Sequence, residues 1–295
     1  MTLALLILLA VDFTTVERLI GAGDFRGALA ALQRAPERAS ARWHLLASKA
    51  YDGLDDPKRA VEEAEAALAI DYRNEAIHLQ LAQIFLTRNT PEPAYEILSE
   101  ARRLFPDSLM IRLGRGLAAK ESERYDEALA DLSECLRRRP DWGLALDALG
   151  AVYLHLNRAS ELAKVAAAHC DRNPRDFRGW YYLAEARSAL GMQDGESERL
   201  VTRSIQLNPN FAASHALLAK MLADRGDTAG AIRELEQAVK LRPDHRPWHV
   251  RLANAYRDAD RAADAERELA VARRLEDQER RPVPVLKYHR GKKQP

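Results

Sequence analysis

This sequence contains few of the residues that report directly on chemistry or cellular location. Its two cysteines, Cys135 and Cys170, lack CxxC or Cys/His spacing, so we interpret both as packing residues rather than disulfide or zinc ligands. Positive and negative charges almost cancel, with 45 Lys and Arg against 44 Asp and Glu, so no overall field attracts nucleic acid or an anionic membrane. Aromatic residues are only 6% of the chain, which disfavours a β-barrel or sandwich and favours helices.

The motifs of the commonest enzyme classes are missing as well. The sequence has no GxxxxGK(S/T) phosphate loop, no GxGxxG after a strand, no GxSxG elbow and no HExxH motif. Carboxylate runs such as residues 62–65 are typical of a solvated helix face. We therefore predict that the chain is not an enzyme and has no catalytic residue and no cofactor.

The longest apolar run, LALLILLAV at residues 3–11, has two interpretations. Its nine residues are far fewer than the roughly 20 that a transmembrane helix needs, so no transmembrane segment is predicted. Residues 1–11 fit the apolar part of a secretory signal or an apolar cap on the fold. The capping-box sequence Thr14–Glu17 predicts that the first regular helix begins after this run. This slightly favours an exported, periplasmic protein over a cytoplasmic one.

A fixed period governs most of the chain. Five prolines are separated by 34, 34, 35 and 34 residues, namely Pro106, Pro140, Pro174, Pro209 and Pro243. A period of this length is typical of a solenoid built from repeated units. If Ala212 is position 1 of one unit, its positions 8, 11, 15, 20, 24, 27 and 32 are Ala219, Leu222, Gly226, Ala231, Leu235, Ala238 and Pro243.

This register resembles the tetratricopeptide repeat (TPR), whose 34-residue unit carries W-x2-L-G-x2-Y followed by Ala, a large apolar residue, Ala and Pro. Another unit supplies Leu149, Gly150, Tyr153, Leu162, Ala166 and Pro174. The resemblance implies an all-α fold, an α-solenoid of stacked antiparallel helix pairs that form a right-handed superhelix. It also implies a concave groove lined by the first helix of each unit. We predict about eight repeats over residues 12–279.

The segment after the array, residues 280–295, does not continue the repeat. It contains six Lys or Arg, three prolines and no acidic residue. We interpret it as a solvated tail or a strand docked on the last repeat. A nucleic-acid-binding arm is less consistent with so few aromatic residues and charges.

Two units depart from the pattern. One has Arg115 where leucine is usual, which predicts a loosely packed first helix. Another has one extra residue in its turn, around Gly191–Gly195, and Ser197 where alanine is usual. There we expect the two helices to splay apart.

Four histidines fall at position 4 of their units: His44, His78, His215 and His249. They lie a whole repeat or more apart, and this position is usually filled by a large aromatic residue. We interpret them as packing residues and predict no metal site. His169 and Cys170 are adjacent, so they point in different directions on a helix and do not form a ligand pair.

The groove that the resemblance implies is lined by positions 2, 5, 6, 9, 12 and 13. Because Tyr and Arg contribute more to binding than their number suggests, the last three units supply the predicted partner-binding residues: Tyr181, Tyr182, Glu185, Lys220, Arg251, Asn254 and Arg257. The Lys, Asn and Arg set with which some TPR proteins grip a C-terminal carboxylate is not present. Ordinary surface decoration is the competing interpretation of these residues.

We therefore predict a non-enzymatic protein–protein interaction scaffold that binds a peptide or protein segment in the concave groove of a TPR superhelix, and no nucleic acid. Two alternatives stay open. The chain could be an accessory subunit of an enzyme or of an envelope biogenesis complex, or a sensor that binds a small molecule or glycan. The sequence does not define the partner or the oligomeric state.

Overall fold

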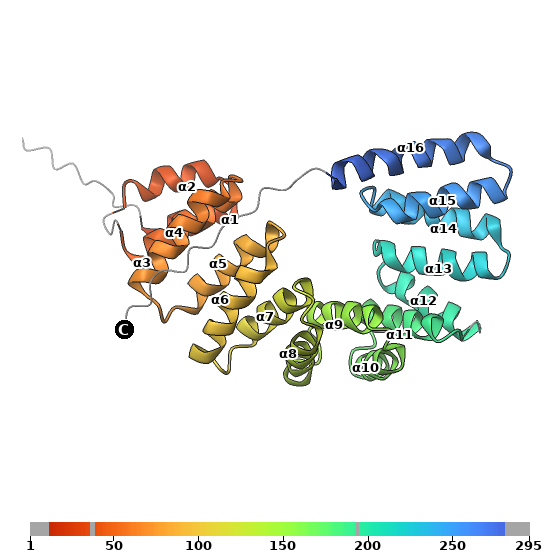
Figure 1. Cartoon of the computed structure of the whole chain (residues 1–295), viewed down its shortest axis with the longest axis horizontal. Coiled ribbons are helices and arrows are strands. Elements are labelled where there is room, and N and C mark those ends of the chain that lie inside the picture. The colour runs from red at the N-terminus through yellow and green to blue at the C-terminus, as the bar shows by residue number, and fades with distance from the viewer. Residues whose placement is uncertain (1–11, 36–38, 193–194, 281–295) are drawn as a thin grey trace, which may run out of the picture. The chain divides into compact units, whose positions relative to one another are not determined.

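The computed structural model describes residues 12–35, 39–192 and 195–280, and every regular element in these ranges is an α-helix (Figure 1). The chain divides into two compact units, whose described parts are residues 12–131 and 132–280, with the boundary inside helix α8. The predicted apolar segment 1–11 lies outside the described residues. The same holds for the predicted tail 280–295, except for Arg280, which directly follows the last helix.

The helices form eight successive pairs in the described chain, and we number the repeats after these pairs. The first unit contains α1 (Phe13–Gly21), α2 (Phe25–Leu32), α3 (Ala41–Gly53), α4 (Pro57–Ile70), α5 (Glu75–Thr87), α6 (Pro91–Leu104), α7 (Leu109–Glu121) and the start of α8 (Tyr125–Arg138). The second unit contains the rest of α8, then α9 (Gly143–His155), α10 (Ala159–Arg172), α11 (Phe177–Ala189), α12 (Gly195–Leu207), α13 (Ala212–Asp224), α14 (Thr228–Leu241), α15 (Arg246–Asp258) and α16 (Ala262–Glu279).

The five regularly spaced prolines each follow the end of the second helix of their repeats. Helix α6 ends at Leu104, two residues before Pro106, and α14 ends at Leu241, two residues before Pro243. The proline ring disfavours the helical conformation for the residue before it. Accordingly Phe105 has φ −126° and ψ 66°, outside the helical region.

The turn inside each repeat has one constant feature, a residue with positive φ at position 15. These residues are Gly23, Asp55, Asn89, Glu123, Asn157, Gly191, Gly226 and Asp260. Glycine reaches this region without strain, and Asp and Asn tolerate it because their short side chains bond locally. The backbone turn therefore repeats even where the glycine does not.

Small residues occupy the closest approaches between helices. Ala60, Ala94 and Ala231, at position 20 of their repeats, are buried, as is Ala238 at position 27. At position 8, a Cβ on Gly150 of α9 would overlap the ring of Tyr182 on α11. Helices of successive repeats thus pack so closely that glycine is needed at this contact.

The predicted capping box at Thr14–Glu17 is wrong. Helix α1 begins at Phe13, and its N-cap is Asp12, whose Oδ1 accepts the backbone N–H of Thr15 at 2.9 Å. A carboxylate one position before the helix satisfies a free N–H of the first turn and needs no reciprocal glutamate. Glu17 instead accepts a hydrogen bond from Arg42 at 3.0 Å.

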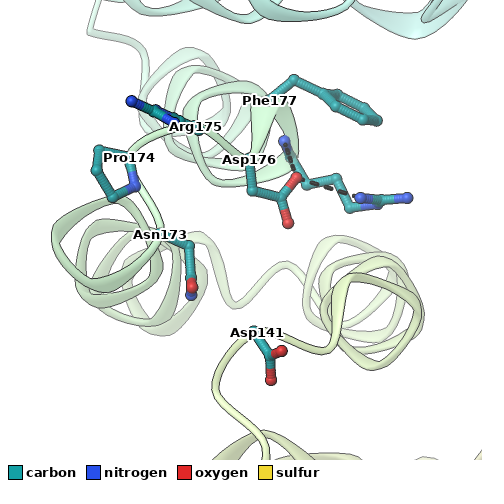
Figure 2. Close-up of a pocket in the computed structure, with 7 residues that line it drawn as sticks. Asp141, Asn173, Pro174, Arg175, Asp176 and Phe177 are labelled. Atoms are coloured by element: carbon teal, nitrogen blue, oxygen red, sulfur yellow. Dashed lines mark hydrogen bonds and ion pairs between the residues drawn. The ribbon is translucent and has the colours of Figure 1, made fainter.

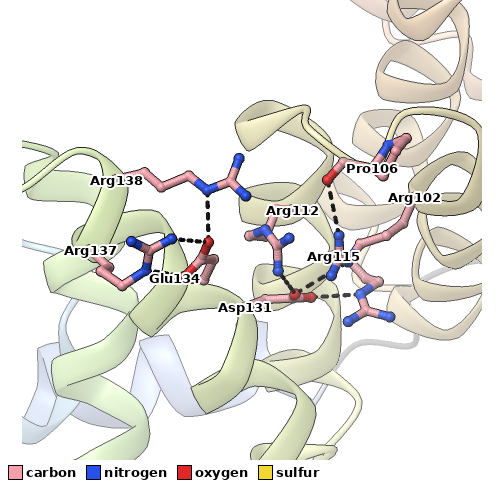
Figure 3. A network of polar contacts seen from close by, with 8 residues as sticks. All are labelled: Arg102, Pro106, Arg112, Arg115, Asp131, Glu134, Arg137 and Arg138. Atoms are coloured by element: carbon pink, nitrogen blue, oxygen red, sulfur yellow. Dashed lines mark hydrogen bonds and ion pairs between the residues drawn. The ribbon is translucent and has the colours of Figure 1, made fainter.

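The arginine in repeat 4 does not loosen its helix as predicted, because it has a buried counter-ion. Arg115 Nε lies 2.6 Å from Oδ2 of Asp131, and Arg112 Nη1 lies 3.2 Å from Oδ1 (Figure 3). Arg102 of α6 approaches the same carboxylate at 3.6 Å. The Asp131 side chain is only 1% exposed, so this ion-pair cluster replaces the usual leucine contact.

The longer turn of repeat 6 does not separate its helices. Ser197 is buried, and its hydroxyl donates a hydrogen bond to the carbonyl of Met192 at 3.1 Å. Leu200 and Val201 of α12 share one core cluster with Ala184 of α11. The two helices of repeat 6 therefore stay packed together, and the predicted splay is wrong.

Replacing Asp131 should destabilise the fold strongly. In Asp131→Asn, three guanidinium groups lose their shared buried counter-charge, and losing one partner of a buried ion pair costs about 3–5 kcal/mol. Urea unfolding followed by circular dichroism measures the loss. One turn further along α8, Glu134 pairs with Arg137 and Arg138 near the surface (Figure 3), so Glu134→Gln is the matched control and should change stability little. Equal losses in both variants would contradict this role of Asp131.

Candidate functional site

A cleft of about 490 Å³ lies along the first helices of repeats 6, 7 and 8, all within the second unit. We call it the concave cleft. Helices α11, α13 and α15 and the turns between the repeats supply its lining residues: Tyr181, Tyr182, Glu185, Phe211, Ala213, Ala216, Leu217, Lys220, Arg242, His245, Trp248 and Arg251.

Helical spacing places these side chains on one face of each helix. On α11, Tyr181 and Glu185 are four residues apart, and on α15, Trp248 and Arg251 are three apart. Residues three or four apart lie on the same side of a helix. The start of α11 is fixed by its N-cap Asp176, whose Oδ1 accepts the backbone N–H of Arg178 at 3.1 Å.

Aromatic side chains form two parts of the lining. The ring of Tyr181 contacts that of Phe211 edge to face, with centroids 5.1 Å apart. In repeat 8, the ring of His245, the N-cap residue of α15, stacks on the ring of Trp248, with centroids 3.8 Å apart. Burial of the imidazole, together with the nearby Arg242, lowers the pKa of His245, so this ring is neutral at neutral pH.

One carboxylate belongs to the lining. Burial raises the pKa of Glu185, while a hydrogen bond with Tyr181 and the charges of Lys220 and Arg251 act in the opposite direction. Burial also raises the pKa of Tyr181, and the nearby carboxylate of Glu185 adds to this rise. Tyr181 therefore stays protonated, and the only acid of the lining is already engaged by protein groups.

Three exposed cations accompany this single acid. Lys220 Nζ donates to Ser188 Oγ at 3.0 Å and to Asp224 Oδ2 at 3.2 Å. Arg242 Nε donates to Asp244 Oδ1 at 3.2 Å. Arg251 has no hydrogen bond or ion pair with any residue that the structure describes, although its charge lowers the pKa of both Glu185 and His245. The guanidinium of Arg251 is thus available to a ligand.

The structure brings together five of the seven predicted partner-binding residues: Tyr181, Tyr182, Glu185, Lys220 and Arg251. Asn254 and Arg257 lie on α15 but do not line the cleft, and Arg257 Nη2 lies 3.8 Å from Oε1 of Glu266. Tyr182 is only 7% exposed, and its hydroxyl donates to the carbonyl of Asp147 at 3.2 Å. Its main role is therefore to pack α11 against α9. Whether these residues bind a partner stays a prediction.

Sequence reasoning missed seven lining residues, for three different reasons. Ala213 and Leu217 stand at positions 2 and 6, so the position rule includes them, but their small or aliphatic side chains drew no attention. Phe211, Arg242 and His245 lie in the turns between repeats, which a rule for first helices ignores. Ala216 and Trp248 are largely buried and expose only an edge to the cleft.

A second hollow, of about 500 Å³, lies around the turn that joins α10 to α11, and Figure 2 shows residues that line it. Three of its polar side chains bond each other or nearby protein groups. Asp176 accepts hydrogen bonds from His169 Nε2 at 3.0 Å and from Arg178 Nη1 at 3.2 Å. Asn173 donates to the carbonyl of Pro140 at 2.9 Å. These bonds fix the turn between repeats 5 and 6, so we assign the hollow a structural role.

Comparisons with known proteins agree with this architecture. A family model described as tetratricopeptide repeat matches residues 222–282. Tetratricopeptide repeat protein 7A of Homo sapiens is 27% identical over 128 residues, which make up 43% of this chain and 15% of the human protein. The chain thus covers only a small part of that relative.

Solved structures show the same fold at low sequence identity. A tetratricopeptide repeat protein from Parabacteroides merdae superposes with a TM-score of 0.66 and 18% identity, covering 80% of this chain and 93% of that one. The C-terminal part of a TPR repeat-containing protein from Cytophaga hutchinsonii has a TM-score of 0.58 and 13% identity, covering 80% and 98%. The chain therefore has the fold of a tetratricopeptide-repeat solenoid, and the eight described helix pairs fit about eight repeats. This fold indicates a protein–protein interaction scaffold.

No helix in the described ranges has the length and apolar character that crossing a membrane requires. In the same residues, no group of three or more His, Cys, Asp or Glu side chains is arranged to hold a metal ion. Both cysteines are buried, in agreement with a packing role, and burial raises the pKa of the Cys170 thiol to about 12.

The position-4 histidines pack between helices as predicted, but most of them also carry a polar tie that the sequence reading missed. In three repeats a ring Nδ1 lies 2.6 to 2.7 Å from a glutamate 19 residues later, in the pairs His44–Glu63, His215–Glu234 and His249–Glu268. The Nε2 atoms of His215 and His249 also lie 3.0 Å from the carbonyls of Pro209 and Pro243. Each of these two rings therefore joins both helices of its repeat to the preceding turn.

In two of these repeats the surroundings of the ring shift its pKa. His215 faces a carbonyl and a carboxylate, which both accept, and the hydrogen bond to Glu234 raises the pKa of His215. His78 has Ile97 where the glutamate would be, and its buried Nδ1 has no hydrogen-bond partner. Burial therefore lowers the pKa of His78. The pKa values of His215 and His78 are thus shifted in opposite directions at the same repeat position.

Glu234→Gln should reduce stability more at low pH than at high pH. A histidine whose pKa is raised by folding stabilises the protein below its unfolded value of 6.5, and this contribution disappears as the pH rises through the folded value. We expect a loss on the order of 1 kcal/mol near pH 5.5 and a smaller loss near pH 8.5. Thermal unfolding at both pH values measures it, with the exposed Glu266→Gln as control. A loss that is the same at both pH values would contradict a charged His215.

Proposed function

We propose that this chain is a non-enzymatic scaffold that holds a peptide or protein segment in the concave cleft. Two observations support the proposal. Solenoids of this class offer their concave surface to protein partners. In this chain, the first helices of three successive repeats contribute side chains to one cleft.

The convergence of three repeats carries the argument. A segment lying across α11, α13 and α15 would contact Tyr181, Lys220 and Arg251 together, since all three line the same cleft. Tyrosine offers a large flat surface at low entropic cost, and arginine forms strong polar contacts, so such residues dominate many interfaces. The guanidinium of Arg251 supports the assignment, because among the described residues it has no hydrogen bond or ion pair that a ligand would have to break.

The two alternatives from the sequence make different demands on this cleft. An accessory subunit would use the same surface, with the bound segment belonging to an enzyme or assembly partner. A small-molecule sensor is favoured by one observation, the cleft volume of about 490 Å³, which lies within the range of small-ligand pockets. A small ligand would not need contacts from all three helices.

Photo-crosslinking in cells of the source organism tests the proposal. A benzoylphenylalanine at Ala213 places the reactive group on the cleft wall, whereas one at the exposed Arg233 places it on α14, away from the lining. We expect a specific protein adduct from position 213 and none from position 233.

The affinity of the crosslinked protein for this chain should then depend on the residues that line the cleft. Tyr181→Ala and Arg251→Ala should each weaken binding by about 1–2 kcal/mol. Arg233→Ala and Lys240→Ala, both exposed on α14, should have little effect. No adduct at position 213, or equal losses in both pairs of variants, would move the binding surface elsewhere.

A further inference from the structure

We infer that the concave cleft selects a segment in which a carboxylate stands beside a large apolar or aromatic side chain. This inference rests on the proposed function and names the chemistry of the ligand. It follows from three properties of the lining: an imbalance of charge, a guanidinium with no hydrogen bond or ion pair among the described residues, and apolar side chains next to it.

The charges of the lining are unequal in number and in exposure. Lys220, Arg242 and Arg251 are exposed cations, whereas Glu185 is the only acid and is partly buried. Glu185 already interacts with Tyr181 and with two of the cations. A ligand entering from solvent therefore meets positive groups first, and an anionic ligand is complementary to them.

Arg251 is the most suitable of the three cations for a ligand carboxylate. Lys220 bonds Ser188 and Asp224, and Arg242 bonds Asp244. Arg251 makes no such bond among the described residues. A free guanidinium can hold a carboxylate through two parallel hydrogen bonds, which gives both strength and orientation.

Apolar side chains line the cleft beside Arg251, although most of their surface is buried. Trp248 precedes Arg251 by three residues on the same face of α15, and its ring is stacked on His245. Leu217 and Phe211 of the neighbouring repeat continue this wall. Since His245 is neutral at neutral pH, it adds flat surface rather than a fourth charge. The side chain next to the carboxylate would gain most here by being apolar or aromatic.

A basic segment has no comparable place in the cleft. Its cation would need Glu185, which is partly buried and already shared between Tyr181, Lys220 and Arg251. It would also face three cations of its own sign. Charge complementarity thus favours one ligand class.

The experiment selects a random dodecapeptide phage library on the immobilised full chain. Enriched peptides are then made with a fluorescein label and an amidated C terminus, and binding is followed by anisotropy. We expect Asp or Glu next to Phe, Trp, Tyr, Leu or Ile. Converting that acid to its amide should weaken binding at least tenfold, and so should Arg251→Ala. Arg251→Lys should recover part of the loss, and Arg233→Ala should change nothing.

Two further arms separate the outcomes. Versions of the peptides that end in a free carboxylate show whether the acid comes from a side chain or a chain terminus. Ala213→Arg, checked for folding by circular dichroism, obstructs the cleft without touching Arg251. Peptides without an acid that still lose affinity in Ala213→Arg would overturn the inference and leave the proposed function intact. Peptides insensitive to every cleft substitution, or a lack of enrichment, would overturn both. Single-stranded oligothymidine that displaces the labelled acidic peptides at a lower concentration than the unlabelled peptides do would contradict a peptide ligand.

Discussion

Close packing between the first helices of successive repeats is the constraint on which the rest of the second unit depends. A single helix pair cannot bury its own apolar face, so each repeat needs the next one. The contact between Gly150 and Tyr182 shows how little space is left, because no Cβ fits there. This spacing brings α11 and α13 close enough for Tyr181 to contact Phe211. The concave cleft is therefore a consequence of the packing.

Polar ties at position 4 reinforce the same arrangement with different chemistry. In repeats 2, 7 and 8, the histidine at position 4 contacts a glutamate 19 residues later in the second helix. In repeat 4, Arg112 and Asp131 occupy the same two positions and form the equivalent contact. Each tie joins the first helix of a repeat to its second helix. Buried charges of this kind are costly to desolvate, so they contribute chiefly to the specificity of the packing in our account.

The sequence predicts the fold well because the fold depends on a periodic property. The 34-residue spacing of prolines and small residues gives the helix pairs and their ends correctly. Errors arise where a local contact outweighs a pattern. The first helix is capped by Asp12, one position before its start, and not by the predicted capping box at Thr14. The unusual Arg115 forms an ion pair with the buried Asp131. The 19-residue spacing from His215 to Glu234 was visible in the sequence, but only the structure shows that it marks a contact.

The site is predicted less completely than the fold. Repeat positions indicate which face of a helix a residue lies on, but not how deeply its side chain is buried. Tyr181 and Arg251 line the cleft as expected. Tyr182 is largely buried between helices, and Asn254 lies outside the lining. His245 comes from a turn, where the repeat gives no rule for the direction of a side chain. Charge state was also beyond the sequence, because it depends on burial and neighbours.

Hydrogen exchange of Gly150→Leu tests most directly the claim that packing between repeats builds the cleft. The added side chain overpacks the contact with Tyr182, at a cost of about 1–3 kcal/mol. Gly21→Ala is the control, since nothing lies within 4 Å of a Cβ there. The account predicts faster exchange in α9 and α11, with α3 and α4 unchanged. Unchanged protection of α11 in a folded Gly150→Leu variant would contradict it.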